Sequence, residues 1–97
     1  MPQFVVEREL PGAGRLSPAE LKKLSLRTCQ ALDTLGPRIR WLHSYVTGDK
    51  LYCLYEAQTE ALIRRLAALG GFSVSRIEMI ATVIDPMAAW SQGQGAA

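Results

Sequence analysis

Residues 39–57, IRWLHSYVTGDKLYCLYEA, are the stretch that most restricts how this chain can fold. Two runs rich in β-branched and aromatic residues flank Gly48-Asp49, a pair that suits a two-residue turn with glycine first. Such a turn fixes the register of an antiparallel hairpin, and alternate side chains of a strand lie on opposite faces. The stretch therefore predicts a hairpin and the set of side chains that share each of its faces.

The segments around the hairpin predict two helices and two further strands. Residues 4–10 are typical of a strand, and residues 75–84 of another. The run Ser17-Pro18-Ala19-Glu20 matches a capping box that begins a helix, and Gly36-Pro37 ends that helix. A second helix is expected over residues 60–69. The order predicts an α+β, ferredoxin-like βαββαβ sandwich, in which a four-stranded antiparallel sheet carries two helices on one face.

Length, composition and charge exclude several classes of protein. The 97 residues suit one domain, which we expect to span residues 1–86, followed by a flexible C-terminal tail at 87–97. The net charge is +2 and the basic residues are scattered, so no nucleic-acid partner is expected. No uncharged run approaches the roughly 20 residues of a membrane span, and the N-terminus lacks a signal-peptide pattern. Two cysteines are too few for a disulfide scaffold, so a cytoplasmic protein without a membrane partner is expected.

The alternation predicts one strand face covered by the helices and one left free of them. The predicted pairs across the hairpin are Tyr45 with Tyr52, His43 with Leu54 and Trp41 with Glu56. The face beneath the helices is expected to hold Phe4, Val6, Leu42, Ser44, Val46, Leu51, Cys53, Tyr55, Ile77, Met79, Ala81 and Val83.

The helix-free face is expected to mix apolar and ionisable side chains. An exposed surface of this kind usually marks an interface or a ligand groove. We therefore predict a homodimer in which two sheets pack face to face as a dimeric α/β barrel. The predicted surface comprises Glu7, Trp41, His43, Tyr45, Tyr52, Leu54, Glu56, Glu78 and Ile80.

His43 is the single histidine of the chain and the main candidate for chemistry. Neutral imidazole is a good ligand for nickel, zinc or copper, and carboxylates can complete such a site. A two-fold dimer would bring two histidines together with the candidate carboxylates Glu7, Glu56 and Glu78. Equally, His43 can be a hydrogen-bonded interface residue, and the glutamates can be solvated partners of Arg8, Arg76 or Lys50.

An enzyme without a cofactor, binding a hydrophobic small molecule over the sheet, is the alternative function. Its candidate catalytic residues are His43 or a glutamate such as Glu78 for proton transfer, and Tyr45 for stabilising an oxyanion. Its ligand pocket would be formed by Trp41, Tyr45, Tyr52, Leu54 and Ile80. A third possibility is a non-catalytic interaction module.

The two cysteines are predicted to be inert. Cys53 lies one position out of phase with His43, so its thiol is expected in the core on the opposite face. Cys29 lies at the edge of the apolar stripe of the first helix and is expected to behave in the same way. Because the alternation puts Cys53 and His43 on opposite faces, a nucleophilic Cys–His pair is not expected.

Several blocks of the sequence resemble one family of short proteins. These blocks are FVVERELPGAG, the S-P-x-E-L helix start, W-x-x-SYVTGDKLYCLYEA, GGF-x-x-x-RI and VIDP, and together they cover residues 3–86. The family is of largely unknown function and includes a small, dimeric, nickel-binding protein with a ferredoxin-like fold. The resemblance implies a homodimer that binds nickel or another divalent transition metal. His43, with Glu7, Glu78 and Glu56, would then supply the metal ligands.

The sequence departs from the family pattern in its second helix. That helix often contains I-R-E-H-A in the family, whereas Ile63-Arg64-Arg65-Leu66-Ala67 stands here. If the missing histidine holds metal in relatives, this chain would bind metal weakly or at another place.

Overall fold

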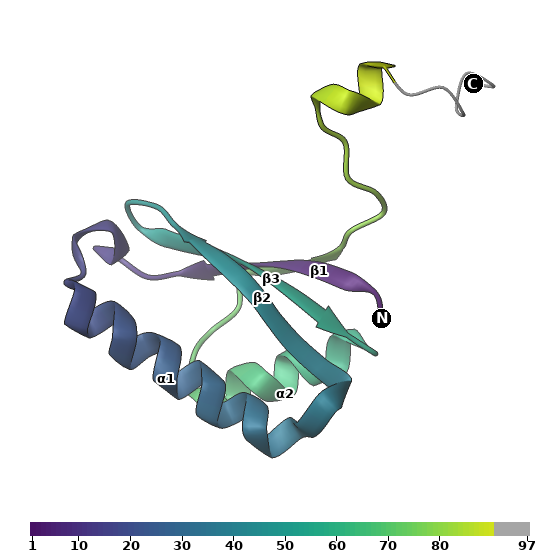
Figure 1. Ribbon diagram of the computed structural model, residues 1–97. Coiled ribbons are helices and arrows are strands. Elements are labelled where there is room, and N and C mark those ends of the chain that lie inside the picture. Colours follow the sequence, from purple (N-terminus) through teal and green to yellow (C-terminus); the bar gives the residue numbers. More distant parts are fainter. Residues whose placement is uncertain (91–97) are drawn as a thin grey trace.

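The computed structural model describes residues 1–90 and contains one four-stranded sheet with two helices packed on one face (Figure 1). Neighbouring strands are antiparallel, and their order across the sheet is β2-β3-β1-β4. The predicted ferredoxin-like sandwich is confirmed. The elements are β1 (Gln3–Glu9), α1 (Pro18–Leu35), β2 (Ile39–Val46), β3 (Lys50–Ala57), α2 (Glu60–Gly70) and β4 (Arg76–Met79), with short 3₁₀ turns at Ala13–Arg15, Gly36–Arg38 and Pro86–Trp90.

Helix α1 begins and ends at the predicted signals. The backbone amide of Glu20 donates to Ser17 Oγ at 3.1 Å, and the amide of Ser17 donates to Glu20 Oε1 at 2.9 Å. These two bonds form a complete capping box. Gly36 ends the helix with a φ of 73°, a value that residues other than glycine rarely adopt.

The hairpin tip is held in place by the loop that follows β1. Gly48 and Asp49 form the predicted two-residue connection. The amides of Leu10 and Gly14 donate to the carbonyls of Asp49 and Gly48 at 2.9 and 3.0 Å. The loop and the tip therefore form one hydrogen-bonded unit at this end of the sheet.

Strand β2 contains a bulge that changes the predicted position of one aromatic residue. The pairs nearest the tip, Tyr45 with Tyr52 and His43 with Leu54, are confirmed. The register then shifts between His43 and Trp41, because Leu42 has no partner of its own.

The prediction for Trp41 is therefore wrong. It pairs with Tyr55 rather than with Glu56, and its side chain packs against the core on the helix side. One extra residue in a strand reverses the face of every residue beyond it.

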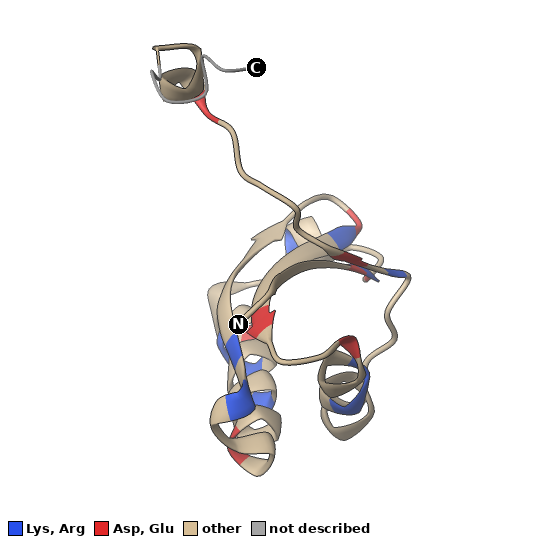
Figure 2. Ribbon diagram, turned by 90° about the vertical axis from the view of Figure 1, so that its right-hand side faces the viewer, with Lys and Arg blue, Asp and Glu red and all other residues tan. Residues whose placement is uncertain are grey.

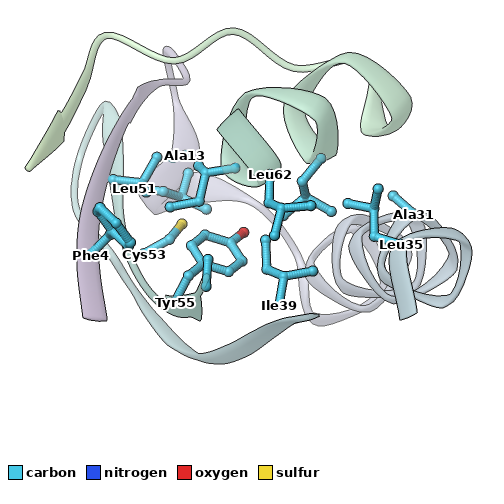
Figure 3. Close-up of a cluster of buried hydrophobic side chains, with 13 residues drawn as sticks. Phe4, Ala13, Ala31, Leu35, Ile39, Leu51, Cys53, Tyr55 and Leu62 are labelled. Carbon is cyan, nitrogen blue, oxygen red and sulfur yellow. The ribbon is translucent and has the colours of Figure 1, made fainter. Parts of the chain in front are cut away.

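The core lies between the sheet and the helices. Figure 3 shows Cys53 and Tyr55 from β3 among side chains that include Leu35 and Leu62 from the two helices. Both β3 residues are fully buried, as are Ile63 and Leu66 of α2 and Val6 of β1. The predicted helix-covered face is thus confirmed at its centre.

Strand β4 is shorter than predicted. It ends at Met79, so the prediction that Ala81 and Val83 are core residues of this strand is wrong, and both are exposed. Met79 pairs with Phe4 but is 64% exposed, because it lies at the end of an edge strand. Residues 81–90 leave the sheet on the side opposite the helices (Figure 1).

The tail predicted at 87–97 falls partly outside the described residues, since the description ends at Trp90. The division between a domain at 1–86 and this tail stays a prediction. Over residues 1–90, none of the helices combines the length and the apolar character that crossing a bilayer requires.

Candidate functional site

The helix-free face of the sheet arranges its side chains in rows across the strands. One row runs from His43 on β2 through Leu54 and Val5 to Glu78 on β4. His43, Leu54 and Glu78 were predicted for this face, and the pairing of the strands places Val5 between Leu54 and Glu78. His43 and Glu78 therefore lie at opposite edges of the sheet.

The adjacent row continues the same surface toward the hairpin tip. It runs from Tyr45 through Tyr52 and Glu7 to Arg76. Together, these two rows define what we call the open face.

His43 and Tyr45 form a contact pair on the edge strand β2. The Nε2 atom of His43 and the hydroxyl of Tyr45 are 3.2 Å apart, and their rings meet edge to face with centroids 5.1 Å apart. Both side chains are accessible, and Tyr45 is 60% exposed. The imidazole is therefore accessible from the helix-free side of the sheet.

Each candidate glutamate has a basic partner nearby. Lys50 Nζ lies 2.8 Å from Glu7 Oε2, and the hydrogen bond to this carboxylate raises the pKa of Lys50. Figure 2 shows acidic and basic positions interspersed over the molecule rather than gathered by sign. The other pairs are Arg40 with Glu56 at 3.0 Å and Arg76 with Glu78 at 2.9 Å.

Part of the predicted site is assembled within one chain. Glu7 and Glu78 line a shallow hollow of about 170 Å³ together with Val5, Tyr52 and Arg76. His43 does not reach this hollow, because three strand spacings of about 4.8 Å separate it from the strand of Glu78. Among residues 1–90, no three His, Cys, Asp or Glu side chains are close enough to hold one metal ion.

The remaining predicted pocket residues are dispersed. Leu54 and Tyr52 lie on the open face, whereas Trp41 lies on the helix side. Ile80 follows the end of β4, and its amide donates to the carbonyl of Gln3 at 2.8 Å. The hydrophobic pocket predicted above the sheet therefore lacks Trp41, the largest of its predicted residues.

Only one of the two cysteines is buried as predicted. Cys53 is buried, and this burial raises the pKa of its thiol, as expected for an inert core residue. Cys29 is exposed, so the expectation that it is buried like Cys53 is wrong. His43 and Cys53 lie on opposite faces, as predicted.

Sequence reasoning missed a second pocket, on the helix side of the sheet. It has a volume of about 200 Å³ and lies between α1 and the hairpin, with Arg8, Trp41 and Tyr55 among its lining residues. The available signal was the alternation in β1, which places the charged Arg8 in phase with the buried Phe4 and Val6.

Comparisons with known proteins agree with this fold. Residues 4–80 match the family model described as nickel responsive protein SCO4226-like. The chain belongs to this family. The crystal structure of SCO4226 from Streptomyces coelicolor A3(2) matches with a TM-score of 0.70 and 13% identity, covering 84% of this chain and 99% of that chain. At this identity the match establishes the fold alone, and no curated protein matches.

Leu66, which stands where the SCO4226-like family often has a histidine, lies in helix α2. Leu66 is 0% exposed and belongs to the core between α2 and the sheet. This position lies on the opposite side of the sheet from His43. A leucine here therefore removes nothing from the open face.

Proposed function

We propose that this protein is a homodimer that binds a divalent transition metal, nickel first, between the open faces of two subunits. The choice of nickel rests on the description of the family as nickel responsive. The observation that carries the site is the exposed His43 on the helix-free face, the face that also carries Glu7 and Glu78. Imidazole nitrogen with carboxylate oxygen is a donor set that suits nickel.

A dimer would bring together ligands that lie far apart within one chain. His43 and Glu78 occupy the two ends of one row. If two sheets face each other about a two-fold axis parallel to the strands, each end of that row lies over the other end in the partner. His43 would then meet the partner subunit's Glu78, and the dimer would hold two equivalent sites. Glu7 and Glu56 are the further carboxylates available on the same face.

The exposed apolar segment after β4 supports dimerisation. Val83, Ile84, Met87 and Trp90 are all large and exposed. They belong to the segment 81–90, which leaves the sheet on the side opposite the helices (Figure 1). Monomeric proteins rarely expose a run of this kind. Packing against a second copy would remove these side chains from water.

Isothermal titration with nickel tests the proposal, together with light scattering for the mass in solution. We expect wild type to be dimeric and to bind one nickel ion per chain. His43→Ala should weaken binding at least about tenfold, because it removes the nitrogen ligand, and Glu78→Gln should also weaken it. Glu9→Gln, which changes an exposed carboxylate of β1, is the matched control and should bind like wild type.

Two results would contradict the proposal. One is nickel binding of equal strength in wild type and His43→Ala. The other is a monomer that binds nickel normally, because a single chain does not bring the ligands together.

A further inference from the structure

The pocket between α1 and the hairpin is separate from the open face. Its walls are mainly apolar, with Leu21 and Leu24 contributed by α1, and Trp41 and Leu51 by the hairpin. Its volume of about 200 Å³ exceeds the share of one water molecule, about 30 Å³, several times. The pocket is therefore large enough for a small organic molecule.

Arg8 places a positive charge at this pocket. Its residue is 6% exposed, and its Cζ atom lies 3.8 Å from the centroid of the Phe72 ring, which is a cation–π contact. No carboxylate of residues 1–90 forms a salt bridge with it, and its Nε atom is buried without a hydrogen-bond partner. A buried charge without a counterion is costly, so an anion that reached it would stabilise the fold.

The neighbouring polar groups can also donate hydrogen bonds. Ser44 Oγ accepts a bond from Trp41 Nε1 at 2.9 Å, which leaves its own hydroxyl proton available. Burial raises the pKa of Tyr55 far above its ordinary value, so this phenol is a neutral O–H donor. The lining contains no Asp, Glu or His, which makes the pocket suited to an anion and unsuited to a metal cation.

We propose that this pocket binds a small organic carboxylate with a compact apolar body. The carboxylate would pair with Arg8 and accept from the hydroxyls of Tyr55 or Ser44, and the apolar body would contact Leu24 and Trp41. Guanidinium–carboxylate pairs are among the strongest hydrogen-bonded contacts in proteins. The inference is independent of nickel binding, since it concerns the other face of the sheet.

Titration of the full chain with benzoate, followed by amide chemical shifts, tests this inference. We expect benzoate to bind with a dissociation constant of about 1 mM or lower. The shifted amides should be those of Ser25, Ser44 and Leu51, whose residues line the pocket. Benzyl alcohol, which has nearly the same shape without the charge, and acetate, which lacks the apolar body, should each bind at least tenfold more weakly.

The variant Arg8→Met removes the charge and keeps an apolar side chain in its place. It should lose benzoate binding at least tenfold while remaining folded, because no carboxylate partner is left unpaired. His43→Ala is the matched control and should bind benzoate like wild type. Three results would overturn the proposal: no shifts at roughly 10 mM benzoate, shifts confined to the open face, or equal binding of benzoate and benzyl alcohol. The comparison of ligands uses wild type alone and does not depend on how the variant folds.

Discussion

The two faces of the sheet are built from the same strands but differ in almost every physical respect. In β3, Leu51, Cys53 and Tyr55 are buried beneath the helices, whereas their neighbours Tyr52 and Leu54 face outward. The helix side holds the packing that stabilises the fold, and the open face holds ion pairs and the accessible histidine. Residues of the proposed metal site can therefore change without disturbing the core.

The largest expected difference between the faces concerns two leucines. Leu66→Ala should lower the free energy of unfolding by about 2–5 kcal/mol, because it leaves a cavity in a fully buried region. Leu54→Ala, on the open face, should lower it by about 1 kcal/mol or less, since this side chain is only partly buried. Urea denaturation measures both values. Equal losses would show that the open face is as tightly packed as the core.

The second difference concerns two aromatic residues of β2. Trp41→Ala should cost about 2 kcal/mol of unfolding free energy, because a half-buried indole packs against the core. Tyr45→Ala should cost well under about 1 kcal/mol in a monomer, since Tyr45 is 60% exposed. Thermal or urea denaturation distinguishes the two. A larger loss for Tyr45 than for Trp41 would contradict the bulge at Leu42.

The smallest effect tests the helix that covers the core side. Ser17→Ala should destabilise the protein by about 1 kcal/mol, because it removes the side-chain cap of α1. The hydrogen bond from the Ser17 amide lowers the pKa of Glu20 below its ordinary 4.5. This bond stabilises the folded state above pH 4.5, and its contribution is lost as the pH falls through the lowered pKa.

Comparing wild type with Glu20→Gln by urea denaturation at pH 7 and at pH 3 isolates this contribution. The loss of stability on acidification should be smaller in the variant. An identical loss in both proteins would show that the capping carboxylate does not contribute.

The fold was predictable because its signals are local. Ser17 and Glu20 marked the start of α1, Gly36 marked its end, and the Gly48-Asp49 tip set the pairing of His43 with Leu54. Each of these features depends on residues a few positions apart. Local chemistry therefore sufficed for the order of the elements and for most of the open face.

The errors arose where distant parts of the chain decide the outcome. No property of Leu42 predicts a bulge. Because Leu42 is an extra, unpaired residue in β2, Trp41 lies on the helix side. Strand β4 ends at Met79 because its antiparallel neighbour β1 begins at Gln3, and the apolar residues beyond Met79 did not reveal this. Arg8 was not recognised as a site residue, since only the packed structure shows a pocket beside it.

The strand order also has a consequence for biosynthesis. Strand β1 lies inside the sheet, between β3 and β4, although it is the first strand to leave the ribosome. Its hydrogen-bonding partners are residues 50–56 on one side and 76–79 on the other. Strand β1 therefore stays unpaired until more than half of the polypeptide has been translated, and during that time it is a segment that a chaperone can bind.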